Sequence, residues 1–265
     1  MKIAAAQTLV TRDPKANGAA IRAQMRDAAG QGARLVHFTE GAISGYAVKE
    51  AETDWGGVAS ELAKVQSLAR ELKLWTVVGS AHRIEGTRQR NSLYVVSDMG
   101  EIAARYDKRL CSLNEITNYY SAGFEPVVFE ADGFRFGMLL CIEIAFAELF
   151  MEYERLGVDC LLFSADMRDE MSSLMLQGHA AGNCYWISAS TPVKTDKADP
   201  AKPGAFPSGV IGPDGYWMAR CAPQSAPGVA VVDLDRGDPR FDIALNKARP
   251  WCRVSRLGEI YRERK

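Results

Sequence analysis

The chain has 265 residues, of which 47% are hydrophobic and 25% are charged, and its formal net charge at pH 7 is −1. This composition is typical of a soluble globular protein and excludes a disordered tail. The near-neutral charge argues against a protein that neutralises nucleic-acid phosphates or coats an anionic membrane. The longest apolar run, residues 136–142, is far shorter than the roughly 20 residues that span a bilayer.

The cysteines and histidines indicate a compartment and argue against a metal site. The six cysteines are widely spaced and form no C-x-x-C motif, and the three histidines form no H-E-x-x-H motif. The N-terminal segment, residues 1–7, reaches a polar side chain too early for a secretory signal peptide. We therefore expect a cytoplasmic protein with free thiols and without a metal ion.

Short β-rich runs alternate with longer helical patterns along the whole chain. Helices are expected at residues 17–29, 58–72, 144–156 and 170–181. Strands are expected at residues 2–8, 34–38, 74–79, 92–96, 102–106, 134–140, 159–164, 185–189, 210–211, 217–219 and 229–234. This alternation predicts an α/β protein with helices covering buried sheets, organised as a single domain over residues 1–265. Two hairpins among these strands argue against a purely parallel sheet.

Three of the predicted strands end in residues that carry chemistry. Glu40 follows a buried strand, Lys108 ends a hairpin strand, and Cys141 stands where a strand gives way to a helix. Active sites in α/β folds gather at such strand ends. Each residue also has a structural interpretation: Glu40 as a helix cap, Lys108 as a surface lysine and Cys141 as a buried core residue. Glu143 and Glu148 are likewise interpretable as the exposed face of the next helix.

A cysteine, a lysine and a carboxylate are together sufficient for covalent acyl transfer without histidine or metal. Backbone N–H groups at the strand-to-helix turn favour a thiolate, and a nearby lysine would lower the pKa of the Cys141 thiol further and stabilise an oxyanion. A carboxylate such as Glu40 would take the thiol proton and later activate water.

The motifs around these residues resemble those of the nitrilase superfamily of carbon–nitrogen hydrolases. Phe38-Thr-Glu40 followed by Ser44-Gly-Tyr46 is similar to the glutamate motif F-P-E then G-Y. Residues 106–110, Tyr-Asp-Lys-Arg-Leu, are similar to the lysine motif, and residues 141–148, Cys-Ile-Glu-Ile-Ala-Phe-Ala-Glu, are similar to C-Y-[DE]-x-x-F-P-E. The likeness extends from about residue 2 to residue 234.

This sequence departs from the family pattern at a few positions. Thr39 and Ala147 replace prolines, Ile142 replaces an aromatic residue, and Gly182 stands where glutamate is usual. None of these changes removes a catalytic group, but they indicate an unusual pocket wall.

The resemblance implies a four-layer αββα sandwich and assembly as a homodimer or a higher even homo-oligomer. It implies that Cys141 is the nucleophile, Glu40 the general base and Lys108 the oxyanion stabiliser. The backbone N–H of Ile142 would complete the oxyanion hole, and Glu115 would position Lys108 and the leaving group. The reaction is then hydrolysis of a small amide, carbamoyl or ureido compound through a thioester, releasing ammonia or an amine. No cofactor is needed, and the expected partner is the small-molecule substrate, with neither a nucleic acid nor a membrane.

Other functions remain open at this point. The same residues could hydrolyse a nitrile, but amidases make up most of the resembled superfamily, so amide hydrolysis is favoured. A non-catalytic relative that binds an amide or acyl ligand is a second alternative, against which the retention of all four residue types speaks. A nucleotide-binding protein has little support, because the chain contains neither G-x-G-x-x-G nor G-x-x-x-x-G-K-[ST].

Two charged residues are candidates for substrate selection. In the resembled family, the segment that corresponds to residues 163–170 lines the substrate pocket. Asp166 facing the pocket would favour an amine-bearing amide, and Arg168 facing it would favour a carboxylate-bearing one. The alternative is that Asp166 caps the helix that begins near Asp169 and that Arg168 is solvated. We expect a polar, charged substrate and not a long aliphatic one.

Overall fold

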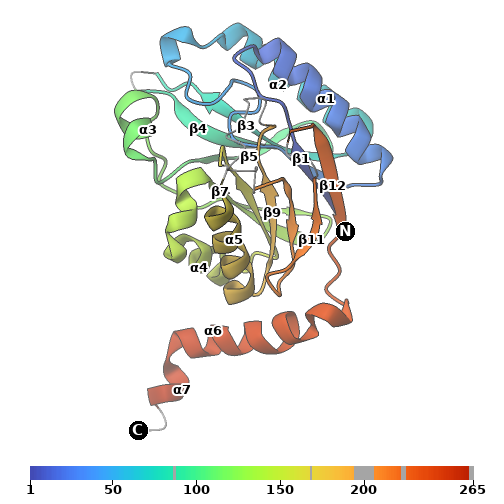
Figure 1. Ribbon diagram of the computed structural model, residues 1–265, viewed down its shortest axis with the longest axis vertical. Helices are drawn as coiled ribbons and strands as arrows, with labels where there is room; N and C mark the ends of the chain where they lie inside the picture. Colours follow the sequence, from blue (N-terminus) through green and yellow to red (C-terminus); the bar gives the residue numbers. More distant parts are fainter. Residues whose placement is uncertain (86–87, 168, 194–205, 222–224, 263–265) are drawn as a thin grey trace.

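Two six-stranded mixed sheets pack face to face in the computed structural model, which describes residues 1–85, 88–167, 169–193, 206–221 and 225–262 (Figure 1). The first sheet has the order β12-β1-β2-β3-β4-β5, comprising Gly228–Asp233, Lys2–Gln7, Leu35–His37, Trp75–His82, Arg90–Val96 and Ile102–Asp107. The second has the order β11-β10-β9-β8-β7-β6, comprising Trp217–Arg220, Gly209–Ile211, Trp186–Ser190, Cys160–Ser164, Phe134–Leu140 and Val128–Ala131.

Helices cover the outer face of each sheet. Helices α1 (Pro14–Gly30) and α2 (Trp55–Leu72) lie over the first sheet, and α4 (Ala147–Arg155) and α5 (Glu170–Asn183) lie over the second (Figure 1). The short helix α3 (Leu113–Asn118) lies beside the sheets, and α6 (Arg249–Leu257) and α7 (Glu259–Arg262) lie beyond them at the C-terminus (Figure 1). The remaining helical turns are η1 (Glu50–Glu52), η2 (Cys141–Ala145), η3 (Pro239–Phe241) and η4 (Ile243–Ala248).

Alternation along the strands explains the layering. In β1, Ala4 and Ala6 pack against α1 and α2, whereas Ile3 and Ala5 face the second sheet. This period of two places one set of side chains in each interface of a strand that is buried on both faces. The predicted four-layer αββα sandwich is therefore confirmed.

Each strand and helix expected from the sequence is present, with ends moved by a few residues. The helix expected at residues 144–156 is divided, because the non-helical backbone of Phe146 separates η2 from α4. Strand β6, α3 and all the helices after β12 were not predicted. Among the described residues, no helix has the length and apolar character needed to cross a membrane.

The C-terminal helix α6 is attached to the second sheet's helices by arginines. Arg253 and Arg256 donate to the two carboxylate oxygens of Glu154 at 3.0 and 2.8 Å, and this glutamate of α4 is almost fully buried. The apolar side chains of Trp251 and Leu257 are exposed instead. The polar face of α6 thus packs on the protein, the reverse of an ordinary surface helix.

A buried histidine joins the two sheets. His37 of β2 is fully buried, and its Nε2 and Nδ1 lie 2.7 Å from Ser164 Oγ and 3.1 Å from Ser188 Oγ. Because Ser164 Oγ donates its own hydrogen to the carbonyl of Phe38, it accepts from Nε2–H, and Ser188 therefore donates to Nδ1. Burial lowers the pKa of His37 to about 3, so the ring is neutral.

We predict that His37 makes the folded state sensitive to acid. In the unfolded state His37 binds a proton near the ordinary histidine pKa, whereas in the folded state it does not. The free energy of unfolding is therefore highest above that pKa and falls as the pH decreases below it. Between about pH 7.5 and pH 5, the His37 contribution to the free energy of unfolding should fall by roughly 2 kcal/mol. Denaturant unfolding of wild type and His37→Gln at both pH values measures this, and an equal pH dependence in the two proteins would contradict it.

Candidate active site

Glu40, Lys108 and Cys141 meet at the ends of three strands. Glu40 follows β2 and Lys108 follows β5, and these strands run in the same direction within the first sheet. Cys141 follows β7 of the second sheet. The loop carrying Glu40 crosses β3 at Gly79, where any side chain would collide with the carbonyl oxygen of Thr39. The close approach of this loop to the sheet therefore requires glycine.

The ammonium group of Lys108 lies between two carboxylates. Its Nζ is 3.0 Å from Glu40 Oε1 and 2.7 Å from Glu115 Oε1, and all three side chains are buried. Hydrogen bonds to the main chain fix the lysine, because its N–H donates to Asn91 and its carbonyl accepts from Gly123. Burial by itself would lower the pKa of Lys108, but the negative charges around it raise that pKa well above its usual value. The lysine is therefore a permanent cation.

The two carboxylates that share this lysine differ in basicity. Burial raises the pKa of Glu40 and repulsion from Glu115 adds to the rise, whereas the charge of Lys108 acts to lower this pKa and only partly offsets the effect of burial. Burial also acts to raise the pKa of Glu115, but the ion pair with Lys108 and hydrogen bonds from Ser112 lower it overall. Environments that separate the pKa values of two neighbouring carboxyls are typical of acid–base sites. Glu40 is the more basic of the pair.

Cys141 occupies a strained turn. Its φ of 51° lies in the left-handed region, which residues with a side chain rarely adopt. Burial raises the pKa of its thiol well above the usual value, the charge of Glu40 adds to this, and the thiol hydrogen-bonds to Glu40. The expectation that Lys108 leaves this thiol with a depressed pKa is therefore wrong for the resting site. The thiol is protonated, with Glu40 as its acceptor.

The remaining candidates differ in how they relate to this cluster. Ile142 lies in the first turn of η2, where backbone N–H groups have no partner within the helix. The backbone N–H of Asp166 donates to Glu40 Oε2 at 3.1 Å. The helix-capping alternative for Asp166 is wrong, because Asp169 caps α5 by accepting from the N–H of Ser172. Arg168 lies outside the described residues.

Sequence reasoning missed Asn91, a buried residue of β4. Its side-chain amide donates to Glu40 Oε1 at 2.7 Å and lies 3.3 Å from Glu115 Oε1. A lone asparagine in a strand gives no signal in a single sequence. Only the register of β4 against β5, which places residue 91 beside Lys108, identifies it.

Sequence reasoning also misplaced Glu143. The interpretation that it lies on the exposed face of a helix is wrong, because Glu143 is fully buried and accepts hydrogen bonds on both oxygens. Glu148 is exposed, as that interpretation predicted. The division of the expected helix into η2 and α4 explains the difference, because it turns the two glutamates in different directions.

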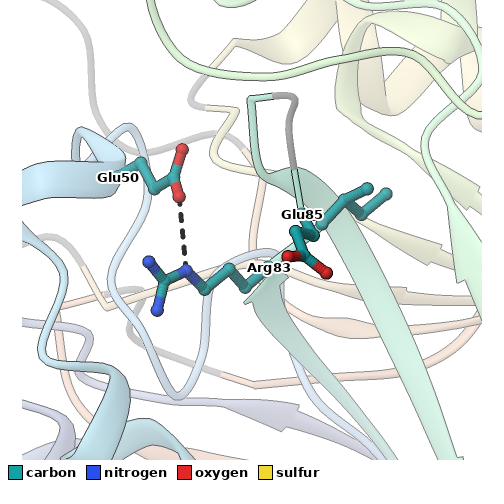
Figure 2. Close-up of a pocket in the computed structure, with 4 residues that line it drawn as sticks. Glu50, Arg83 and Glu85 are labelled. Atoms are coloured by element: carbon teal, nitrogen blue, oxygen red, sulfur yellow. Dashed lines mark ion pairs between the residues drawn. The ribbon is translucent and has the colours of Figure 1, made fainter.

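One pocket shares no lining residue with this cluster. It is lined by Glu50, Arg83, Ile84 and Glu85, and Arg83 pairs with Glu50 at 3.4 Å (Figure 2). Arg83 is largely exposed, so this ion pair contributes little. Within the described ranges, no group of three or more histidine, cysteine, aspartate or glutamate side chains is placed to hold a metal ion.

Comparison with known proteins decides the family. The sequence profile of the family described as "Carbon-nitrogen hydrolase" matches residues 2–241. The chain belongs to this family. The resemblance to nitrilase-type carbon–nitrogen hydrolases is thereby confirmed over nearly the whole chain.

Relatives of this carbon–nitrogen hydrolase carry amidase names. It is 28% identical to the chloroplastic omega-amidase of Arabidopsis thaliana, over 92% of this chain and 70% of that protein. It is 25% identical to the human omega-amidase NIT2, over 80% of this chain and 81% of that protein. The crystal structure of an amidase from Nesterenkonia sp. has the same fold, with a TM-score of 0.78 and 22% identity, covering 93% of this chain and 95% of that one.

We predict that Asn91 tunes the basicity of Glu40. Replacing Asn91 with leucine, which has a similar shape and no donor, removes a hydrogen bond that stabilises the charged carboxylate, so the pKa of Glu40 should rise further. The free energy of a hydrogen bond to a charged group corresponds to a pKa shift of about one unit. The acid limb of the rate of Cys141 alkylation by iodoacetamide should move up by that amount. Asn118→Leu, at an exposed position of α3, is the control, and an unmoved limb in Asn91→Leu would contradict the prediction.

Proposed function

We propose that this carbon–nitrogen hydrolase is a cysteine-dependent amidase that hydrolyses a small amide through a thioester. The observation that carries the proposal is the buried Lys108 ammonium held between Glu40 and Glu115, with the Cys141 thiol hydrogen-bonded to Glu40. The omega-amidase names of its relatives support an amide as substrate. A glutamate-to-glutamine mutant of the Nesterenkonia amidase, which has the same fold, shows the result of Michael addition of acrylamide at its active-site cysteine.

The first half of the reaction forms the acyl-enzyme. The Cys141 thiol gives its proton to Glu40 as sulfur attacks the amide carbon. The oxyanion that develops is stabilised by the Lys108 ammonium and by the backbone N–H of Ile142. The C–N bond then breaks, the amine or ammonia leaves with the proton from Glu40, and a thioester on Cys141 remains. Glu115, which holds Lys108 at 2.7 Å, positions it for this step.

The second half reverses these roles. Glu40 takes a proton from water, which attacks the thioester carbon, and Lys108 and Ile142 again stabilise the oxyanion. Collapse of this intermediate breaks the C–S bond, releases the acid and returns the proton to the Cys141 sulfur. A carboxylate whose pKa is raised by burial suits both proton transfers, because it is a stronger base toward the thiol and toward water than an ordinary glutamate.

We predict that activity depends on all three side chains of this cluster. A screen for ammonia release from a panel of amides, ureido compounds and nitriles should find amides turned over fastest. Cys141→Ala should abolish turnover, and Glu40→Gln and Lys108→Ala should each reduce kcat by about 10²-fold or more. A Cys141→Ala protein retaining a tenth of wild-type activity would contradict the nucleophile assignment. Nitriles turned over faster than the matching amides would favour the nitrilase alternative, and a wild-type protein that turns over none of the compounds would favour a binding-only relative.

We also propose a polar, charged substrate. The Oδ1 atom of Asp166 is buried next to a backbone N–H that donates to Glu40, so its charge lies near the reacting group. A substrate amine would meet Asp166, whereas a carboxylate would be recognised by Arg168. The omega-amidase names of the relatives are compatible with an amide that also carries a second polar group.

We predict that one of these two residues selects among acyl groups. Kinetics with amine-bearing, carboxylate-bearing and neutral amides should show a preference in wild type that Asp166→Asn or Arg168→Met reduces by about tenfold, through a lost charge-assisted contact. The alternative result is an unchanged preference in both variants, which would make these residues structural and place selection elsewhere.

We propose further that residues 1–265 form a single domain that assembles as a homodimer or a higher even homo-oligomer in the cytoplasm. The pairing of β12 with β1 and the attachment of α6 to Glu154 support one domain. Exposed Met171 and Leu174 on α5 support association. The six free cysteines suit a reducing compartment. Light scattering of the purified protein measures the oligomeric state.

A further inference from the structure

Glu143 is a buried carboxylate that accepts hydrogen bonds from four donors and has no ion-pair partner among the described residues. Its Oε1 accepts from the backbone N–H groups of Arg109 at 2.8 Å and Leu110 at 3.1 Å, and its Oε2 accepts from that of Leu140 at 2.7 Å. The hydroxyl of Tyr106 lies 2.8 Å from both oxygens. Burying a carboxylate costs free energy unless such hydrogen bonds compensate. We therefore expect the Glu143 carboxylate to perform a role at this position.

The donors come from two different sheets and flank the two central residues of the site. Arg109 and Leu110 directly follow Lys108 at the end of β5, whereas Leu140 directly precedes Cys141 at the end of β7. Glu143 therefore connects the main chain beside the lysine with the main chain beside the cysteine through a single side chain.

Two further observations make this connection important. Cys141 has a left-handed backbone, which persists only where surrounding contacts hold it. The bond from Leu140 to Glu143 lies immediately before that residue. The lysine segment has a second attachment, because Arg109 also pairs with Glu152 of α4 at 2.7 Å, but this bond does not reach the cysteine turn.

We propose that Glu143 is a positioning residue that sets the placement of the Lys108 ammonium relative to the Cys141 thiol. Glu143 touches neither the substrate nor the reacting atoms. It fixes the position of the segment that carries Lys108 relative to the segment that carries Cys141. The oxyanion formed by sulfur attack therefore arises beside the Lys108 ammonium. The inference about catalysis rests on the proposed amidase function, but the geometry it concerns does not.

A carboxylate is the side chain that this role requires. All the main-chain partners are N–H donors, so each oxygen must accept. A glutamine would direct its NH₂ group either at Leu140 or at the Arg109 and Leu110 pair, and two facing donors cannot bond. Glu143→Gln therefore releases one of the two loops while keeping the shape of the side chain.

The first test measures the pH dependence of Cys141 alkylation and needs no substrate turnover. The charged groups around the Cys141 thiol are Glu40, Glu115 and Lys108, and of these Lys108 alone favours the thiolate. In Glu143→Gln, displacement of Lys108 should move the pH midpoint of Cys141 alkylation by iodoacetamide upward by about one unit. Loss of the Glu143 charge alone would move it downward, so the sign of the shift separates positioning from simple electrostatics.

The second test reads catalysis. In Glu143→Gln, kcat for the best amide should fall by about 10²-fold while KM changes little. The matched control is Glu152→Gln, the same substitution at the α4 residue that pairs with Arg109, which should leave the alkylation midpoint unmoved and kcat within about threefold of wild type. An unmoved or downward midpoint in folded Glu143→Gln overturns the proposal, whatever the turnover. A wild-type protein that turns over no amide overturns the proposed function instead.

A second variant covers the case in which Glu143→Gln does not fold. Glu143→Asp keeps the charge but is one methylene shorter, so it cannot reach both loops at once. The upward shift of the alkylation midpoint should persist in this variant, and a wild-type midpoint with wild-type kcat would overturn the proposal.

Discussion

The buried ammonium group of Lys108 is the interaction on which the rest of the site depends. Two carboxylates lie within 3.0 Å of it, from segments that follow different elements of the chain. Removing one member would leave an unpaired charge in the interior, which costs far more than the pair gains. Asn91 and Ser112 add hydrogen bonds to these two carboxylates. Their surroundings divide the carboxylates into an ionised partner, Glu115, and a more basic one, Glu40.

The sandwich supplies the rigidity that such a cluster needs. Lys108 and Glu40 come from the first sheet and Cys141 from the second, so any sliding between the sheets would separate them. His37 prevents this at one position by bonding to serines of the second sheet. Glu143 does the same closer to the reacting atoms. Packed interiors deform little, and the helices on both outer faces complete that packing.

The sequence predicted the layers and the charged residues of the site, for physical reasons that can be identified. The succession of short apolar strands and longer amphipathic helices is a local property of the sequence, and so is the position of Glu40, Lys108 and Cys141 at strand ends, whereas the four layers came from the resemblance of the motifs to a known family. Asn91 and Glu143 depend instead on which strands are neighbours and where a helix breaks at Phe146. The sign of the shift in the thiol pKa depends on the sum of burial and two carboxylates against one lysine. Helix α6 was missed because its arginines, and not its apolar residues, face the protein.

The left-handed backbone of Cys141 lowers the stability of the folded protein at the position where function requires a side chain. At φ 51° a glycine has no steric penalty, whereas any side chain does. Replacement of the cysteine by glycine would therefore relax the turn at the moment it removes the sulfur. Selection for robustness alone would favour the inert protein at this position. The chain therefore keeps a strained backbone at this position because the nucleophilic sulfur is required for function, even though a glycine would give a more stable turn.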